Sequence, residues 1–367
     1  MAKPILQVRD LHVRFSLRGR SLHALRGINL DLYEGESLAI VGESGSGKSV
    51  LNKNFIGLLD KNGSVTAGSI RYYGMDDKFR NHPAGGSDEH GCYVDLAKFT
   101  KNEDWLRIRG SEICMIPQDP MTSLNPLKTI GWQIEEALKL HRGMTGKMAR
   151  DETIRILQDV RIDDPARRAK QYPHELSGGM RQRIVIAIAI ACSPRILICD
   201  EPTTALDVTI QAQVLSLLKE LKEKYKLTII FITHDLGVVA NIAERVAVMY
   251  AGDIVEIGMV NEIFFDPRHP YTWALLSSLP QLGEKGEDLY TIHGTPPSLF
   301  KEVSGDAFAT RNPKSLVVDH KVRPPYFDVS PTHKARTWLL DPRAPQLEPP
   351  AVIRKLKELG GVHNDSK

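Results

Sequence analysis

The sequence predicts an α/β fold in which a mostly parallel sheet is flanked by helices, and two observations predict it. Residues 42–49 read Gly-Glu-Ser-Gly-Ser-Gly-Lys-Ser, which matches the pattern G-x-x-x-x-G-K-[ST]. The apolar run at residues 38–41 is typical of a buried strand, and the apolar residues after the pattern fall at helical spacing. A strand, this loop and a helix in that order indicate a site for a nucleoside triphosphate.

The residue types in this loop suit bound phosphate. Glycines allow tight curvature that aims backbone N–H groups inward, and the helix beginning near Lys48 adds its positive dipole end. Lys48 supplies a point charge, and Ser49 can hold Mg²⁺. A chance glycine-rich turn is the competing interpretation, and the flanking strand and helix argue against it. Kinases, GTPases and motor ATPases share the loop. The candidate nucleotide-binding residues are Gly42, Glu43, Ser44, Gly45, Ser46, Gly47, Lys48, Ser49 and Val50.

The composition is that of an ordinary globular protein. With 367 residues the chain is long enough for a full core and more than one domain. An apolar content of 42% and a charged content of 25% are usual, and a net charge of +3 is too small to indicate nucleic acid binding. The four cysteines form no C-x-x-C pair, and Cys192 and Cys199 are expected to be buried free thiols, as in a reducing compartment.

Neither a signal peptide nor a membrane span is expected. The N-terminus has no apolar core of signal-peptide length, and the longest apolar stretch, residues 184–199, is broken by Ser193-Pro194-Arg195. Any role at a membrane would therefore come through partners.

The N-terminal part alternates like strands of a small sheet. Runs at residues 5–8, 11–15 and 28–32 precede a turn at Glu34-Gly35-Glu36 and the strand before the phosphate loop. Phe15 could stack on an adenine ring or be a core phenylalanine, and spacing does not decide between the two.

Residues 74–104 are polar and weakly patterned, which predicts a surface insertion. His82, His90 and Cys92 match no metal-site spacing, so a solvated loop is favoured over a metal site. From residue 132 to about 168 the apolar residues fall at helical spacing.

The most informative polar residues follow residue 176. Ser177 is a predicted N-cap of an apolar helix, and Gly178 and Gly179 leave the amides at its start open to an anion. The buried strand at residues 196–200 ends in Asp200 and Glu201. One carboxylate there can hold Mg²⁺, and the next can orient and deprotonate a water molecule. Alone, each could be an ordinary charged turn.

An amphipathic helix at residues 208–225, a strand at 228–233 and a hairpin of 245–250 with 254–257 complete the pattern. His234 stands at the end of the strand. A lone histidine there is more often structural than catalytic.

In this order, the motifs resemble the nucleotide-binding subunit of an ABC transporter. The resemblance rests on the phosphate loop, residues 176–179, Asp200-Glu201, Ala205-Leu206-Asp207 and His234, and it spans residues 5 to about 265. It implies an ABC cassette: a core sheet, an antiparallel β subdomain, and a helical subdomain at about residues 119–180.

The same resemblance implies roles for single residues. Phe15 would stack on adenine, and Gln118 would sense magnesium and the membrane subunit. Asp200 would support Mg²⁺ together with Ser49 and Gln118, Glu201 would be the general base, and His234 would contact the γ-phosphate. Ser177, Gly178 and Gly179 would cover the γ-phosphate of the ATP held on the opposite subunit. Asp207 belongs to the matched Ala205-Leu206-Asp207 motif, so the resemblance implies that it is also a nucleotide-binding residue.

Residues 117–126 and 269–272 are similar to the oligopeptide/dipeptide permease subfamily, specifically its D-type ATPase subunit, which also carries a C-terminal extension. This implies an ATPase domain at residues 1–265 and an extension at 266–367. It also implies peptide cargo, two integral membrane permease subunits, an extracytoplasmic peptide-binding protein, and a peripheral place at the cytoplasmic face of the cell membrane. Related systems for nickel, glutathione or other small solutes share these motifs.

A single phosphate loop and a single signature segment predict a head-to-tail pair, in which each loop faces the partner's signature. The second ATPase is expected to be a different, homologous chain, as in the subfamily. Two rival classes rank below this one. A soluble ABC protein acting on DNA or ribosomes usually carries a coiled-coil insertion, zinc motifs or two cassettes. A P-loop small-molecule kinase leaves the signature and Gln118 unexplained. We expect no nucleic acid partner.

The extension differs from the extensions of its apparent relatives, many of which bind an iron–sulfur cluster through four cysteines in this region. By alignment these positions hold Asp306, Asn312, Thr337 and, approximately, Asp319, and no cysteine follows Cys199. Oxygen ligands are poor substitutes for thiolates on iron. We therefore expect ATP and Mg²⁺ as cofactors but no iron–sulfur cluster, with the extension held by apolar residues such as Phe308 and Val317.

Overall fold

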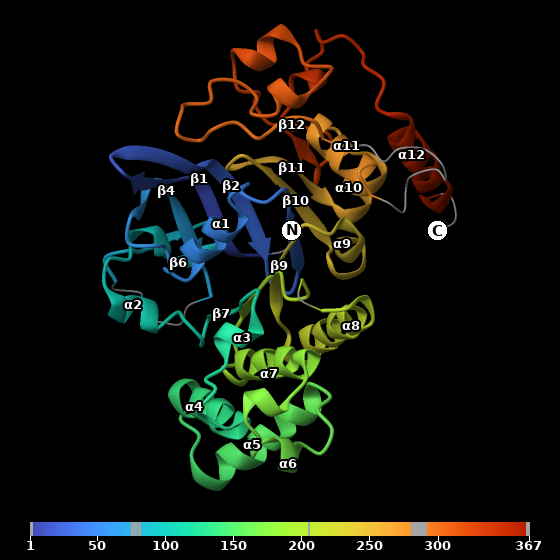
Figure 1. The fold of residues 1–367 in the computed structure, drawn as a ribbon. Helices are drawn as coiled ribbons and strands as arrows, with labels where there is room; N and C mark the ends of the chain where they lie inside the picture. Colours follow the sequence, from blue (N-terminus) through green and yellow to red (C-terminus); the bar gives the residue numbers. More distant parts are fainter. Residues whose placement is uncertain (1–2, 75–78, 80–81, 205, 280–291, 365–367) are drawn as a thin grey trace.

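The computed structural model describes residues 3–74, 79, 82–204, 206–279 and 292–364, so Ala205 of the expected motif lies outside the described residues. Two sheets form the middle of the molecule (Figure 1). The helices α4 to α6 lie at one end of the molecule, and the C-terminal extension, coloured orange to red, lies at the opposite end (Figure 1). None of the described helices is long and apolar enough to cross a membrane.

The first sheet is antiparallel, with strand order β2-β1-β4-β6-β5. Strand β1 joins the two predicted N-terminal runs, because the backbone bulges at Asp10, where φ is 46°, and then continues. The strands are β1 (Pro4–Leu17), β2 (Arg20–Tyr33), β4 (Gly63–Tyr72), β5 (Gly85–Asp88) and β6 (Gly91–Asp95).

The predicted solvated loop at residues 74–104 is wrong for a large part of that range. Strands β5 and β6 form a hairpin that extends the first sheet, and Val94 and Leu96 are fully buried in its core. The strands are short and rich in glycine and aspartate, so they lack the alternation that identifies a longer strand.

The second sheet has the order β12-β13-β11-β10-β3-β9-β8-β7, and β10, β3, β9, β8 and β7 run parallel. Parallel strands bring their carboxyl ends to one edge, so the loop after β3 and the carboxylates after β8 share that edge. The strands are β3 (Ser37–Val41), β7 (Ile113–Ile116), β8 (Ile196–Asp200), β9 (Thr228–Thr233), β10 (Arg245–Tyr250), β11 (Asp253–Met259), β12 (Phe327–Asp328) and β13 (Lys334–Ala335).

The helical stretch expected at residues 132–168 consists of three helices. Thr129 caps the first by accepting the N–H of Trp132, and Gly143 ends it in the left-handed conformation. The helices are α1 (Lys48–Phe55), α2 (Asn102–Leu106), α3 (Pro120–Ser123), α4 (Ile130–Arg142), α5 (Gly146–Asp159), α6 (Pro165–Arg168), α7 (Gly178–Ala191), α8 (Val208–Tyr225), α9 (Leu236–Ile242), α10 (Val260–Phe265), α11 (Pro270–Ser277) and α12 (Ala351–Asn364).

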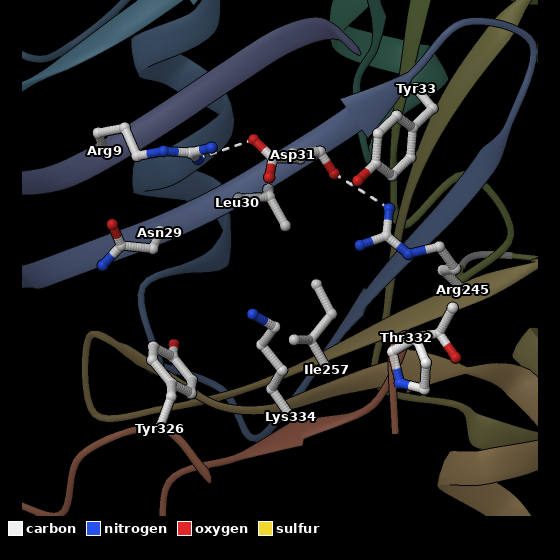
Figure 2. Close-up of a pocket in the computed structure, with 11 residues that line it drawn as sticks. Arg9, Asn29, Leu30, Asp31, Tyr33, Arg245, Ile257, Tyr326, Thr332 and Lys334 are labelled. Carbon is white, nitrogen blue, oxygen red and sulfur yellow. Dashed lines mark hydrogen bonds and ion pairs between the residues drawn. The ribbon is translucent and has the colours of Figure 1, made fainter. Parts of the chain in front are cut away.

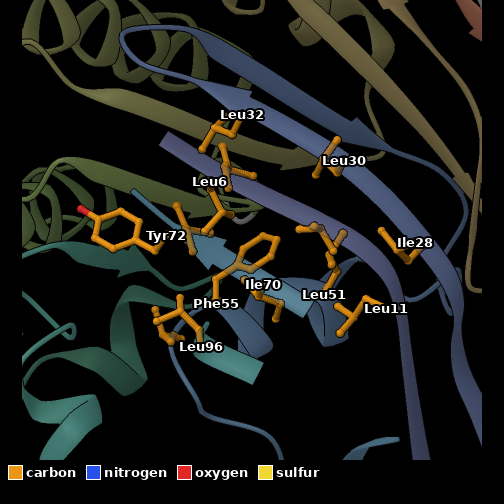
Figure 3. Packing of buried hydrophobic residues seen from close by; sticks show 14 of the residues in the cluster. Leu6, Leu11, Ile28, Leu30, Leu32, Leu51, Phe55, Ile70, Tyr72 and Leu96 are labelled. Carbon is orange, nitrogen blue, oxygen red and sulfur yellow. The ribbon is translucent and has the colours of Figure 1, made fainter. Parts of the chain in front are cut away.

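Helix α1, which follows the phosphate loop, is fixed by the core between the sheets (Figure 3). Its Leu51 and Phe55 are fully buried and share a cluster with Leu6 and Ile70 of the first sheet. Burying a side chain of this size contributes about 1.5–3 kcal/mol. The start of α1 therefore has a rigid support.

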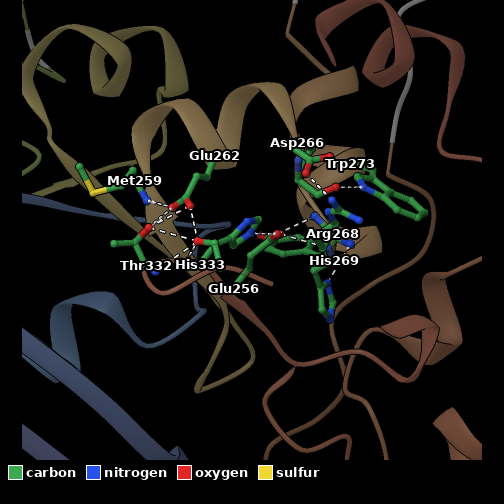
Figure 4. Close-up of polar contacts among 12 residues, drawn as sticks. Glu256, Met259, Glu262, Asp266, Arg268, His269, Trp273, Thr332 and His333 are labelled. Atoms are coloured by element: carbon green, nitrogen blue, oxygen red, sulfur yellow. Dashed lines mark hydrogen bonds and ion pairs between the residues drawn. The ribbon is translucent and has the colours of Figure 1, made fainter. Parts of the chain in front are cut away.

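The extension continues the second sheet, because β13 pairs with β11. A buried polar network joins the two parts (Figure 4): Glu256 of β11 lies 2.7 Å from His333 and accepts the backbone N–H groups of Arg268 and His269. Phe308 is buried as expected, but Val317 is 73% exposed, so the expectation that it helps to hold the extension is wrong.

Candidate nucleotide-binding site

A cavity of about 820 Å³ lies beside the phosphate loop. Its apolar lining comes chiefly from β1 and β2, and its polar lining comes from the loop and from the carboxyl edge of the parallel strands. The lining residues are Phe15, Leu17, Leu22, Ala24, Ser44, Gly45, Gly47, Lys48, Ser49, Val50, Asp60, Asn62, Gln118, Glu201, His234 and Leu299.

The loop conformation requires glycine. Gly42, Gly45 and Gly47 have φ of 151°, 79° and 103°. A Cβ on Gly42 would lie 2.0 Å from the carbonyl oxygen of Met249, and Gly47 forms the N-cap of α1. The predicted curvature is confirmed, and the amides at the start of α1 are positioned to meet an anion.

Lys48 is held within the loop. Its Nζ donates to the carbonyl oxygens of Gly42 and Glu43 at 2.7 and 2.9 Å. Burial lowers the pKa of Lys48, while the carboxylates of Glu201 and Asp200 raise it. A bound phosphate would stabilise the charged form of this side chain.

Glu201 is oriented by three neighbours at the end of β8. Its carboxylate accepts Gln118 Nε2 at 3.1 Å and Thr204 Oγ1 at 3.0 Å, and lies 3.4 Å from His234 Nδ1. Its φ is 47°, a left-handed conformation that costs energy for a residue with a side chain. The structure therefore brings Glu201, Gln118 and His234 together at the cavity.

Asp200 has the surroundings of a cation ligand. Burial and the charge of Glu201 raise its pKa, and a hydrogen bond from Ser49 opposes that shift. The oxygens of Ser49, Asp200 and the Gln118 amide are the hard ligands that Mg²⁺ prefers. These residues fit the ion that the resemblance implies.

The signature residues do not line this cavity. Ser177 caps α7 by accepting the N–H of Met180, and a Cβ on Gly178 would meet no atom within 4 Å. A Cβ on Gly179 would lie 2.8 Å from Ile210 Cγ2. Asp207, predicted among the nucleotide-binding residues, is the N-cap of α8 and accepts the N–H of Ile210. These residues lie around the start of α7 and are not among the residues that line the cavity.

Phe15 lines the cavity and is only 8% exposed, so it is part of the core and also borders the cavity. Sequence reasoning missed Thr204, Asn62 and Leu299. The pairing of Phe15 with Gly63 across β1 and β4 brings Asn62 to the cavity, and no local motif indicates that pairing.

A second cavity, of about 460 Å³, lies between the first sheet and the extension (Figure 2). Its charged residues pair with one another or with neighbours: Arg9 with Asp31 at 2.7 Å, and Arg245 with the Asp31 carbonyl at 3.1 Å and with Glu36. None of the site residues predicted from the sequence lines it.

The chain is similar to known families in two regions. Residues 25–204 match the family model "ABC transporter", and residues 255–316 match "Oligopeptide/dipeptide transporter, C-terminal region".

Three curated relatives match almost the whole chain. The oligopeptide transport ATP-binding protein AmiE of Streptococcus pneumoniae is 55% identical over 96% of this chain and 94% of its own length. The dipeptide transport ATP-binding protein DppD of Lactococcus lactis is 51% identical over 94% and 93%. The oligopeptide transport ATP-binding protein OppD of Bacillus subtilis is 49% identical over 98% and 95%.

Solved structures share the fold of about 70% of this chain. The ATP-binding cassette MJ0796, as a dimer bound to ADP and phosphate, is 27% identical with a TM-score of 0.57, covering 70% of this chain and 98% of that one. The cassette cbiO1 of Clostridium perfringens is 26% identical with a TM-score of 0.58, covering 72% and 92%.

Proposed function

Because this chain belongs to the ABC transporter family, in its oligopeptide and dipeptide branch, we propose that it is the ATP-hydrolysing subunit of a peptide importer. The observation that carries the proposal is one cavity that joins Lys48 of the phosphate loop to Glu201, Gln118 and His234. ATP would bind with its phosphates on the loop and on the N-terminus of α1, and its adenine near Phe15.

In this proposal Glu201 is the general base. A carboxylate held by Gln118 and Thr204 is oriented to accept a proton from water, and His234, at 3.4 Å from that carboxylate, would contact the γ-phosphate. Ser49, Asp200 and Gln118 would hold Mg²⁺, which neutralises developing phosphate charge when bound.

The subunit works as half of a pair. Ser177, Gly178 and Gly179 lie outside this chain's cavity, which supports their acting on the ATP of a second ATPase. ATP favours the closed pair through contacts that only the closed state makes, and hydrolysis reopens it. We propose a homologous chain as the second ATPase.

The family resemblance supports the remaining partners that we propose. Two integral membrane permease subunits would convert closure into transport, an extracytoplasmic binding protein would deliver the peptide, and this subunit would sit peripherally at the cytoplasmic face of the membrane. Relatives named for oligopeptide and dipeptide transport support peptide as cargo. Nickel, glutathione or another small solute is the alternative.

We propose that the extension folds without an iron–sulfur cluster. Each of the four side chains at the cysteine positions accepts a nearby backbone N–H instead: Asp306 that of Phe308, Asn312 that of Lys314, Asp319 that of Leu316 and Thr337 that of Leu339. One oxygen of each side chain is thus engaged in a turn, and oxygens are poor ligands for iron.

Co-purification from native membranes tests the assignment. We expect the tagged chain to bring down two integral membrane subunits and a second ATPase. Recovery of ribosomes or DNA in their place would contradict it.

A further inference from the structure

The extension reaches the nucleotide cavity through residues 292–300, which we call the strap. Leu299 of the strap lines the cavity beside Leu22 and Ala24 of β2. Between these two residues, the N–H of His23 donates to the Leu299 carbonyl at 2.9 Å. This hydrogen bond fixes the strap against β2 at the point where Leu299 faces the cavity.

Further contacts set the course of the strap. Pro296 and Pro297 favour an extended backbone just before Leu299. The guanidinium carbon of Arg20 lies 5.6 Å from the centre of the Phe300 ring, which adds a second contact with β2. The strap is therefore held against β2 at Leu299 and Phe300.

Arg311 joins the strap to the phosphate loop. Its guanidinium donates to the carbonyl oxygens of Ile292 and His293 at 3.3 and 2.9 Å, and to both carboxylate oxygens of Glu43 at 2.6 and 3.1 Å. The Arg311 side chain is only 4% exposed, and its hydrogen bonds to Glu43 raise its pKa. A bidentate ion pair of this kind fixes the relative orientation of Arg311 and Glu43 and also stabilises their contact.

Glu43 is also held through its backbone. Its N–H donates to the hydroxyl of Tyr271 on α11 at 2.8 Å, and its carbonyl accepts Lys48 Nζ. Both the side chain and the N–H of this loop residue are thus bound by residues that follow position 265. A shift of the extension would therefore be transmitted to the loop that receives the phosphates.

We propose that the C-terminal extension completes the nucleotide site, with Leu299 contacting the base or ribose of ATP and Arg311 positioning the phosphate loop through Glu43. The inference rests on the proposed ATP-binding function. Leu299 belongs to the apolar part of the lining, with Phe15 and Leu22, where an aromatic base gains dispersion and burial. Arg311 touches the loop only through Glu43, so it is a positioning residue.

Leu299 is tested by comparing two probes on the full-length chain. ATP and inorganic tripolyphosphate compete with a fluorescent ATP analogue, in wild type, Leu299→Ala and Leu299→Asp. Both variants should raise the Kd for ATP, by about 5- to 30-fold for Leu299→Ala, because a buried apolar contact of about 1–2 kcal/mol is lost. The Kd for tripolyphosphate should stay unchanged, because it has no base. Lys301→Ala, an exposed strap neighbour outside the lining, is the control.

Two results would overturn the role of Leu299. An unchanged ATP affinity in Leu299→Asp would mean that the side chain does not contact the nucleotide. An equal loss for both probes would mean that it acts only through the fold. If wild type bound neither probe, the proposed function itself would fail, which is a separate outcome.

Arg311 is tested by a double-mutant cycle with Glu43. Arg311→Ala and Glu43→Ala should each weaken ATP and tripolyphosphate equally, and the double variant should be no weaker than the single ones, since both remove the same pair. Arg311→Lys keeps the positive charge but cannot form the bidentate contact with Glu43, so an intermediate affinity is expected. This variant should also remain folded. Arg343→Ala, which breaks an exposed pair with Asp341, is the control. Fully additive losses, or wild-type affinity in Arg311→Ala, would overturn the positioning role.

Discussion

At the scale of residues, the geometry around Glu201 is the most informative feature. The left-handed backbone at φ 47° is unfavourable for glutamate, and hydrogen bonds from Gln118 and Thr204 maintain the side chain in one orientation. Strain of this kind persists where surrounding contacts fix it, and it is common at catalytic sites.

Glu201→Gln should bind ATP and hydrolyse it slowly. The amide keeps the shape of the side chain but cannot accept a proton from water, and losing a general base costs about 10²–10⁴-fold in rate. Steady-state phosphate release and ATP titration measure the two effects. Glu220→Gln, which changes an exposed glutamate on α8 paired with Arg161, is the control and should match wild type. Near-normal turnover of Glu201→Gln in the assembled transporter would contradict the role.

The sequence could point to cavity residues only where the signal is local. Lys48, Ser49 and the loop glycines follow one another in the chain, so their spacing alone identifies them. Leu299 and Asn62 reach the same cavity by tertiary contacts, and neither carries a local pattern. Arg311 and Glu43 are 268 positions apart, which no short motif can reveal.

At the scale of elements, helix α7 connects the signature to the core. Ser177 caps its N-terminus, and the helix ends in an apolar stretch at residues 184–191 that is largely buried. The surface at Gly178 is open, which leaves room for a phosphate of the partner. At Gly179 a Cβ would lie 2.8 Å from Ile210 Cγ2, so a larger side chain would not fit there.

Ser177→Arg should leave ATP binding by the single chain intact and block closure of the pair. The long side chain would occupy the place of the partner's γ-phosphate, whereas the chain's own cavity lies elsewhere. ATP titration of the single chain and ATP-dependent association of the pair separate the two effects. Ser177→Ala removes the cap, worth about 0.5–2 kcal/mol, without adding bulk, and should still close.

Lys48→Ala is the reference for lost ATP binding, because this variant should lose ATP affinity in the single chain. If Ser177→Arg lost ATP affinity in the same way as Lys48→Ala, the head-to-tail arrangement would be wrong.

Elements with strong periodicity were predicted well, including the helix at residues 208–225 and the strand at 228–233, which the structure has at those bounds. The hairpin of β5 and β6 was missed, because its strands are short and its pairing with β4 is a tertiary interaction. Val94, Leu96 and Phe99 are buried apolar residues of this stretch that could have indicated a buried face.

At the scale of the whole molecule, the extension is bound to the cassette by sheet pairing and hydrogen bonds, and not only by the chain connection. β13 extends the second sheet, and the fully buried Glu256 binds His333 from the extension and two backbone N–H groups (Figure 4). Removing one partner would leave a buried polar group without its hydrogen bond, which costs about 1–3 kcal/mol. The extension and the cassette are therefore expected to unfold together.

The extension should carry no stoichiometric iron. The chain is purified without oxygen and assayed for iron and for the broad visible absorption of thiolate–iron bonds. A variant with cysteines restored at all four positions shows whether the assay detects a cluster in this extension; the changes are Asp306→Cys, Asn312→Cys, Asp319→Cys and Thr337→Cys. Stoichiometric iron with that absorption in the native chain would contradict the prediction.

The measurement that tests the central claim most directly is peptide uptake by the reconstituted transporter. The chain, its partner ATPase and the permease subunits are placed in liposomes with the binding protein, and entry of a labelled oligopeptide is followed. Uptake should require ATP and fall by about 10²-fold or more when Glu201 is changed to Gln. ATP hydrolysis without peptide uptake, in a complex that imports nickel or glutathione instead, would contradict the account.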